Sequence, residues 1–273
     1  MIQKSFKTDR GNIVYWTNQH ESGRANLVFL PGLTADHRLF DMQIEALKDK
    51  YNVFVWDAPG HATSKDFELT FTLDEKAMYL KQILDAEKIE SPVLIGQSMG
   101  GYVSQAFIQI YPGAASGFIS IDSAPLKRKY VTAAEIWLLK RMEPVYRMFP
   151  WKLLKKWGSN GVATTEYGRK LMLEMMRTYD DDKKHYCRLS GHGFILLAEA
   201  MEKNLPYEIN CPVLLICGEK DNAGSAKSYN RRWAKGENIP IAWIKDAGHN
   251  ANTDKPEEIN QLIETFIEEN LKY

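Results

Sequence analysis

The sequence predicts an α/β protein in which helices cover both faces of a mostly parallel β-sheet. Short apolar segments alternate with amphipathic helical segments over most of the 273 residues, which is the pattern of such a sheet. The alternation stops between Ala124 and Pro206, where helical periodicity and Gly and Pro breaks predict a helical insertion. We therefore expect one core, residues 1–123 and 207–273, and a helical cap, residues 124–206.

Strands are predicted where short apolar runs are bounded by polar, Gly or Pro residues. Continuous apolar runs are typical of parallel strands that are buried on both faces. The first 18 residues differ, because Asp9-Arg10-Gly11-Asn12 is a hairpin signal between two strands. The expected strands lie within residues 1–18 and at residues 27–30, 53–56, 93–95, 117–121, 212–217 and 241–244.

Helices are predicted where apolar residues recur at helical spacing, in several cases after a capping signal. Thr72 and Glu75 match a capping box, in which each side chain accepts a hydrogen bond from a backbone N–H of the first turn. Pro256 and the two glutamates after it mark the start of the last helix. The expected core helices lie around residues 40–47, 72–84, 99–110, 226–234 and 256–266.

Ser98 lies in a glycine-rich turn between a predicted strand and a predicted helix. The sequence GQSMG at residues 96–100 follows the strand at 93–95 and precedes a helix that begins at Met99. A G-x-S-x-G turn exposes the serine hydroxyl, because its glycines remove side chains that would collide with the strand and the helix. Free N–H groups at the helix start favour a negative charge beside the hydroxyl. The pattern therefore predicts that Ser98 is a nucleophile.

A serine nucleophile needs a general base and an acid that orients the base. In an open parallel sheet such groups collect at the carboxyl ends of the strands. Asp221 follows the strand at 212–217 and His249 follows the strand at 241–244, so they are the expected acid and base. Asp122, which directly follows another strand, is an alternative acid.

Five motifs, in this order along the chain, resemble those of the α/β-hydrolase superfamily. They are FLPGLT, WDAPGHATS, GQSMGG, the GEKD that contains Asp221 and the AGH that contains His249. The resemblance covers nearly the whole chain and implies an eight-stranded, mostly parallel sheet, a helical cap and hydrolysis by Ser98, His249 and Asp221. It also implies that backbone N–H groups of Leu33 and Met99 form an oxyanion hole, and that no metal or organic cofactor is required.

The identity of the nucleophile narrows the expected reaction. Dehalogenases and epoxide hydrolases of this superfamily use an aspartate where this chain has Ser98, so cleavage of a carboxylic ester or lactone is the primary expectation. Hydrolysis of a carbon–carbon bond in a dienoic diketone is an alternative, and a non-catalytic ligand receptor on the same fold is another. A menaquinone-pathway synthase with a similar motif carries an arginine where this chain has Tyr102, which disfavours that reaction.

The cap is the segment expected to select the substrate. Residues 124–206 contain 16 Lys and Arg against nine Asp and Glu, so this basic segment either attracts anionic substrates or an anionic surface, or is simply solvated. Trp137, Trp151 and Trp157 are expected to bind the substrate in an apolar pocket. Alternatively, these tryptophans and the methionines at 172, 175 and 176 form the core of the cap.

Composition and charge exclude several classes of protein. The 35 basic and 35 acidic side chains balance, so no global charge points to nucleic acid or to a membrane. Three cysteines, at residues 187, 211 and 217, are expected to be reduced, because their number is odd and metal-ligand spacing is lacking. Neither a signal peptide nor an apolar run of membrane-spanning length is present. We expect a cytoplasmic protein without stable membrane insertion that acts on a small-molecule substrate.

Overall fold

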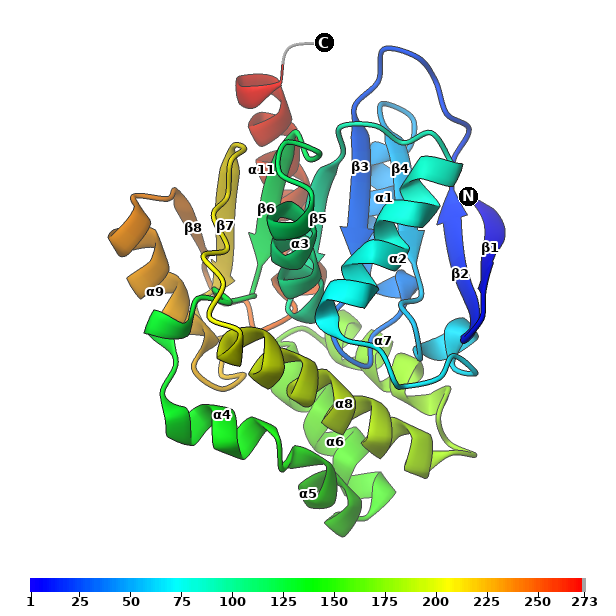
Figure 1. Ribbon diagram of the computed structural model, residues 1–273, viewed down its shortest axis with the longest axis vertical. Coiled ribbons are helices and arrows are strands. Elements are labelled where there is room, and N and C mark those ends of the chain that lie inside the picture. Colours follow the sequence, from blue (N-terminus) through cyan, green and yellow to red (C-terminus); the bar gives the residue numbers. More distant parts are fainter. Residues whose placement is uncertain (272–273) are drawn as a thin grey trace.

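One eight-stranded sheet forms the centre of the computed structural model, which describes residues 1–271 (Figure 1). Its strand order is β1-β2-β4-β3-β5-β6-β7-β8, in which β1 pairs antiparallel with β2, β2 pairs antiparallel with β4, and all other neighbours are parallel. The strands are β1 (Ile2–Thr8), β2 (Gly11–Thr17), β3 (Asn26–Leu30), β4 (Asn52–Trp56), β5 (Val93–Gln97), β6 (Gly117–Ile121), β7 (Val213–Gly218) and β8 (Ile241–Ile244). The predicted α/β fold with a mostly parallel sheet is confirmed.

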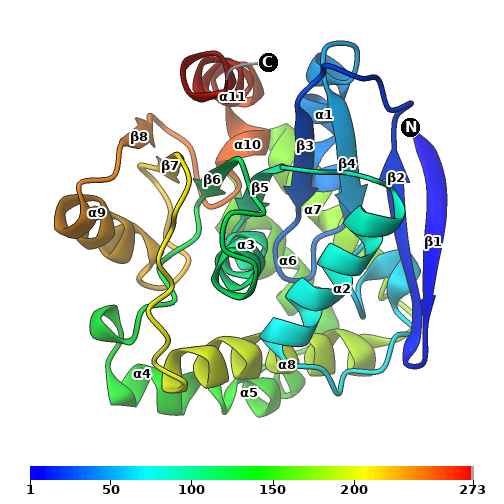
Figure 2. The same ribbon diagram turned by 45° about the horizontal axis from the view of Figure 1, so that its top comes forward.

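Helices cover both faces of this sheet (Figure 2). Apolar side chains of α2, α3 and α9 pack on one face, and those of α1 and α11 pack on the other. Every residue of β4, β5 and β6 is buried, which explains why these strands are continuous apolar runs in the sequence. The core helices are α1 (Asp41–Leu47), α2 (Leu73–Ala86), α3 (Met99–Ile110), α9 (Ala226–Glu237), α10 (Ala251–Asp254) and α11 (Pro256–Asn270).

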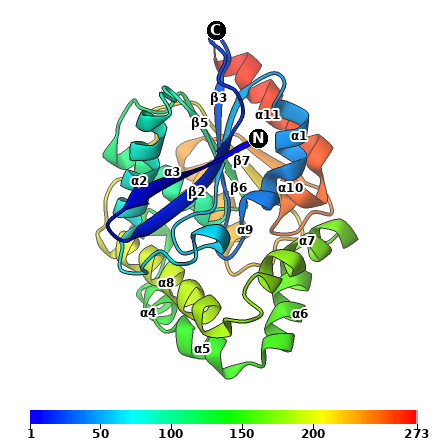
Figure 3. The same ribbon diagram turned by 90° about the vertical axis from the view of Figure 1, so that its right-hand side faces the viewer.

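A run of five helices between β6 and β7 forms the inserted segment, which lies at the end of the molecule opposite the C-terminus (Figure 3). These helices are α4 (Ala133–Leu139), α5 (Met142–Met148), α6 (Trp151–Val162), α7 (Glu166–Arg177) and α8 (Lys183–Glu202). They lie within the predicted cap, whose boundaries as a separate domain stay a prediction. Three short 3₁₀ turns complete the fold, at His37–Phe40, Ala62–Ser64 and Arg128–Tyr130. Among residues 1–271, no helix has both the length and the apolar composition needed to cross a bilayer.

The carboxyl ends of the parallel strands meet at the edge of the sheet that faces the inserted helices (Figure 1). Ser98 follows β5 and Asp122 follows β6. Asp221 follows β7 and His249 follows β8, so four loops from neighbouring strands bring these side chains to one place.

Candidate active site

Ser98 occupies the sharp turn between β5 and α3. Its backbone angles, φ 49° and ψ −114°, belong to a region that residues other than glycine rarely adopt. Two backbone hydrogen bonds hold the turn: the Ser98 N–H donates to the carbonyl oxygen of Ile121 at 2.9 Å, and the Gly101 N–H donates to the Ser98 carbonyl oxygen at 3.0 Å. The surrounding structure therefore keeps the serine in an unfavourable conformation.

The glycines beside Ser98 allow β5, α3 and β3 to come into backbone contact. A Cβ on Gly96 would lie 2.4 Å from the backbone N of Gly101. A Cβ on Gly100 would lie 1.8 Å from the carbonyl oxygen of Leu30. Atoms do not approach so closely without moving the backbone, so both positions require glycine, as the sequence pattern predicts.

His249 connects the hydroxyl of Ser98 to the carboxylate of Asp221. The Nε2 atom of His249 lies 2.9 Å from Ser98 Oγ, and its Nδ1 atom lies 3.2 Å from each carboxylate oxygen of Asp221. The Asp221 side chain is fully buried and that of His249 is nearly so. In this arrangement Nδ1–H donates to Asp221, which leaves Nε2 free to accept the proton of Ser98. The structure thus brings together the three side chains that the sequence singles out.

Asp122, the alternative acid, faces the same loops without bonding to the imidazole. One of its carboxylate oxygens accepts the backbone N–H of Gly218 at 2.7 Å, and the other accepts that of Ala251 at 3.0 Å. Gly218 leads into the loop that carries Asp221, and Ala251 comes directly after the loop that carries His249. Asp122 therefore fixes the two loops that hold the acid and the imidazole, while Asp221 makes the contact to the ring.

Burial and the neighbouring charges shift the pKa of the His249 imidazole and of the Asp122 carboxyl. Burial disfavours the charged form of His249, but the hydrogen bond that its ring donates to Asp221 and the charges of Asp221 and Asp122 outweigh this and raise the pKa of His249 above its ordinary value. Burial, together with the nearby Asp221 charge, raises the pKa of Asp122 above its ordinary value. The protonated imidazole is thus stabilised, which is what a general base at this position needs.

Gln97 is a positioning residue that the sequence analysis did not single out. Its Nε2 donates to the backbone carbonyl oxygen of His249 at 2.8 Å and lies 3.2 Å from the Oδ1 of Asn250. This amide ties the turn of Ser98 to the loop of the imidazole. Its place directly before Ser98, at the end of a buried strand, was the available signal.

The backbone groups expected to form the oxyanion hole flank Ser98. Met99 is the first residue of α3, so its N–H lies at the open start of a helix. On the other side, a Cβ on Gly32 would lie 3.2 Å from the Cβ of Ser98, so the loop that contains Leu33 passes directly beside the serine. The Leu33 side chain packs on Gly193 of α8, where a Cβ would come within 2.5 Å of it. The loop is thereby held between the serine and the inserted helices.

Comparisons with known proteins place this chain in a family. The model of the alpha/beta hydrolase family matches residues 27–262. The chain belongs to this family. The uncharacterized hydrolase YugF of Bacillus subtilis is 26% identical, with 97% of each chain covered, and 3-oxoadipate enol-lactonase 1 of Acinetobacter baylyi is 27% identical, with 88% of each covered. A thermophilic esterase from Thermogutta terrifontis has the same fold, with a TM-score of 0.73, 20% identity and complete coverage of both chains.

Two of the three tryptophans expected to bind substrate in this hydrolase are exposed, and the third packs against an aromatic residue of α8. Trp137 on α4 and Trp157 on α6 are each more than half exposed. Trp151 packs edge-on against Tyr186, and its indole N–H donates to Asp180 at 2.7 Å. These positions give no support to an apolar substrate pocket built from the three tryptophans, because half of the surface of two of them faces solvent.

The methionines of α7 form part of the core under the inserted helices. Met175 and Met176 are fully buried and Met172 is nearly so. They belong to the apolar cluster that also contains residues of α1 and of α8. The methionines therefore pack as core, as the alternative predicts, whereas Trp137 and Trp157, which it also places in the core, are exposed. The three cysteines are free thiols, as expected.

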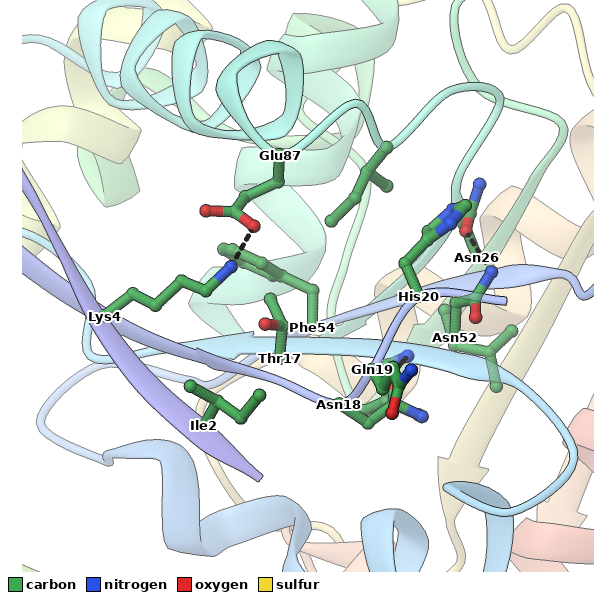
Figure 4. Close-up of a pocket in the computed structure, with 13 residues that line it drawn as sticks. Ile2, Lys4, Thr17, Asn18, Gln19, His20, Asn26, Asn52, Phe54 and Glu87 are labelled. Atoms are coloured by element: carbon green, nitrogen blue, oxygen red, sulfur yellow. Dashed lines mark hydrogen bonds and ion pairs between the residues drawn. The ribbon is translucent and has the colours of Figure 1, made fainter. Parts of the chain in front are cut away.

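The pocket drawn in Figure 4 lies away from the candidate site. It is lined by residues at the start of β3 and β4, by the end of β2, and by Lys4 and Glu87, whose side chains form an ion pair (Figure 4). These are the amino ends of the parallel strands, the opposite edge of the sheet from Ser98. The pocket therefore contains none of the residues expected to act on a substrate.

Proposed function

We propose that this hydrolase cleaves a small carboxylic ester or lactone through an acyl-enzyme intermediate. The observation that carries the proposal is the hydrogen-bonded line of Ser98, His249 and Asp221, with 2.9 Å between hydroxyl and imidazole. The 3-oxoadipate enol-lactonase of Acinetobacter baylyi supports a lactone, and the Thermogutta terrifontis esterase supports an open-chain ester.

In the first half-reaction, His249 Nε2 removes the proton of Ser98 Oγ while this oxygen attacks the carbonyl carbon. The carbonyl π electrons move to the oxygen, and the N–H groups of Met99 and Leu33 stabilise the resulting oxyanion. The imidazolium is stabilised by Asp221. When the tetrahedral intermediate collapses, the C–O bond of the ester breaks and the leaving oxygen takes the proton from Nε2.

In the second half-reaction, water replaces the alcohol. His249 removes a proton from the water, the hydroxide attacks the acyl carbon, and Ser98 Oγ leaves with the proton returned by Nε2. In a lactone the alcohol stays attached to the acyl group, so a single hydroxy acid is released. Neither half-reaction requires an added cofactor.

Labelling with a serine-directed fluorophosphonate tests the nucleophile. We expect a single covalent adduct in the intact mass of the native chain and none in Ser98→Ala, whose matched control is Ser104→Ala, a buried serine elsewhere on α3. An adduct that survives in Ser98→Ala, or no adduct on the native chain, would contradict the mechanism.

A substrate panel then distinguishes the reaction classes. Nitrophenyl esters of increasing chain length and lactones of increasing ring size are compared with a vinylogous diketone. Turnover of esters or lactones with Ser98-dependent kinetics supports the proposal. Turnover of the diketone alone would instead assign the carbon–carbon hydrolase reaction.

A further inference from the structure

Large apolar side chains are exposed on three consecutive helices, α4, α5 and α6. In residues 1–271, the other exposed large apolar side chains are scattered over β1, α1, α2, α7 and the N-terminus. Exposed apolar residues are ordinary when single, but a group of them marks a contact surface. The exposed fractions in this group are Trp137 57%, Leu138 52%, Val145 38%, Met148 81%, Leu153 37% and Trp157 51%.

The place of these helices leaves their outer side without a partner among the described residues. Figures 1 and 3 show α4, α5 and α6 at the far end of the molecule, with α7 and α8 between them and the sheet. Their inner side packs on these two helices through buried residues such as Ile136 and Leu154. We call the six exposed apolar residues and the basic residues among them the outer cap surface.

The outer cap surface is basic. Residues 133–162 contain six Lys or Arg and two Glu, a net charge of +4 in a chain whose total is zero. Within the described part of the chain, Arg141, Lys152 and Lys156 form no ion pair, and the Arg141 guanidinium lies 4.0 Å from the centre of the Trp137 ring. The other three cations pair with Glu202, Glu143 and Asp180. Unpaired cations therefore adjoin exposed apolar residues along the chain, Lys152 beside Leu153 and Lys156 beside Trp157.

We propose that the outer cap surface docks on the surface of an anionic phospholipid bilayer. Tryptophan and long aliphatic side chains enter the boundary between headgroups and acyl chains, and Lys and Arg beside them attract anionic headgroups. A two-fold dimer through the same surface is disfavoured, since it would bring the unpaired cations of both copies, Arg141, Lys152 and Lys156, into one interface. Because no described helix can span a bilayer, the association is peripheral.

If the proposed ester hydrolysis holds, docking on a bilayer also indicates which esters reach the candidate site. Of the bilayer-facing helices, α4 and α5 pack on α8, and Gly193 of α8 contacts Leu33 beside Ser98. In a docked molecule, α8 thus lies between the candidate site and the helices that contact the membrane. We infer that the substrates include apolar esters that partition into the bilayer.

Co-sedimentation with vesicles tests the docking without using catalysis. The full chain is mixed with phosphatidylcholine vesicles that contain or lack phosphatidylglycerol, at low and at high salt. We expect binding to the anionic vesicles that weakens in high salt and is much weaker without phosphatidylglycerol. No binding to anionic vesicles would overturn the proposal.

Two double variants separate the two parts of the surface. Lys152→Glu with Lys156→Glu is expected to weaken binding about 30-fold or more, since each lysine near an anionic surface contributes about fivefold. Leu138→Glu with Met148→Glu is expected to weaken it about tenfold or more. The control is Met42→Glu with Met78→Glu, which changes two methionines that are 39% and 41% exposed on α1 and α2, away from this surface.

The outcomes distinguish the alternatives. Equal vesicle binding by all three double variants would overturn the proposal. The proposal would also be overturned if sedimentation velocity showed that the native chain is a dimer and that the double variant Leu138→Glu with Met148→Glu is a monomer. Hydrolysis of a water-soluble ester by these variants at the native rate shows that the fold and the candidate site are intact. Lost docking with retained hydrolysis supports docking, whereas docking by a chain that hydrolyses no ester would contradict only the proposed function.

Discussion

Asp122 and Asp221 place carboxylate oxygens within 4.8 Å of each other, yet only Asp221 bonds to the imidazole of His249. Asp122 instead accepts two backbone N–H groups, one from each loop that borders the imidazole. Neighbouring strands thus supply two buried acids with different tasks. One orients and stabilises the ring, and the other holds the loops in which the first acid and the ring are fixed.

Asparagine substitutions at these two positions should therefore differ in effect. Asp221→Asn removes the negative charge that stabilises the imidazolium and turns an N–H towards Nδ1, so we expect kcat to fall about 10³-fold to 10⁴-fold on the scale known for serine proteases. Asp122→Asn leaves the Asp221 contact in place and replaces one accepted hydrogen bond, so we expect a loss of about tenfold in kcat and about 1–3 kcal/mol in stability. Ester kinetics and urea unfolding measure both.

The reverse ranking, with Asp122→Asn more damaging to kcat than Asp221→Asn, would assign the orienting role to Asp122. Circular dichroism and unfolding midpoints show whether either variant has lost its fold. Glu219→Gln, which changes an exposed carboxylate in the same loop as Asp221, is the matched control and should retain native kcat.

The pH dependence should report the raised pKa of His249. Nε2 accepts the Ser98 proton only when the imidazole is neutral, so kcat/KM should rise with pH through an apparent pKa above the ordinary value of 6.5. In Asp221→Asn the rise of kcat/KM should occur at lower pH, because the hydrogen bond and the charge that raise the pKa of His249 are gone. Ester hydrolysis measured from about pH 5 to pH 9 gives the apparent pKa of kcat/KM. An apparent pKa below the ordinary histidine value in the native chain would contradict this account of the imidazole.

Most of the candidate site could be predicted from motifs that are short and contiguous in the sequence. The strand, the turn and the helix around Ser98 are contiguous, so the residues themselves specify the geometry. His249 and Asp221 were predictable because each follows a strand whose carboxyl end must lie at the same edge. The preference for Asp221 over Asp122 depended on motif context alone, because both follow strands, and the arrangement of the loops after β6, β7 and β8 decides which acid faces the ring.

The cap was harder to predict for a different reason. Aromatic residues at helical spacing, such as Trp137 and Trp157, are compatible with a pocket, a core or a surface. Which side of α4 or α6 is buried depends on where α7 and α8 lie, and that contact is not encoded in local spacing. Local spacing also does not reveal the buried Lys76, which lies one helical turn before the buried Leu80, because lysines on a helix usually face solvent.

Alanine substitutions at Gly100, which is tightly packed, and at Gly161, which faces open space, should change stability in opposite directions. Gly100→Ala would place a Cβ 1.8 Å from the backbone oxygen of Leu30, so we expect a loss of about 3 kcal/mol or more of unfolding free energy. Gly161→Ala on α6 meets nothing within 4 Å and should stabilise the chain by about 0.5–1 kcal/mol through helix propensity. Urea unfolding of both variants measures the difference, and a neutral Gly100→Ala would show that α3 can move away from β3.

The strained turn at Ser98 should be detectable as stored free energy. Glycine tolerates φ 49° with ψ −114°, whereas alanine does not, so Ser98→Gly should be more stable than Ser98→Ala by about 1 kcal/mol. Both variants should lack ester hydrolysis. The comparison is made by thermal unfolding in the same buffer. If Ser98→Ala proves the more stable of the two, the turn stores no strain and the backbone angles of the serine impose no cost.

The buried Lys76 should make the free energy of unfolding increase with pH above neutrality. It lies in the first turn of α2, is 2% exposed, and burial alone lowers its pKa from 10.5 to about 7. The unfolded chain therefore binds one more proton than the folded chain between these two values, so this residue makes the stability of the native chain rise as the pH increases from about 7 to 10.5.

Lys76→Met keeps the length of the side chain and removes the buried charge, so we expect it to stabilise the chain at pH 7 by about 1–4 kcal/mol. This advantage should shrink as the pH approaches the ordinary lysine pKa, because the unfolded native chain then loses its extra proton. Urea unfolding near neutral pH and near the ordinary lysine pKa provides both values, and Lys65→Met, at an exposed position, should show no such convergence. If Lys76→Met destabilises the chain equally at both pH values, the ammonium is paired in solution and the buried lysine contributes favourable contacts that outweigh its desolvation.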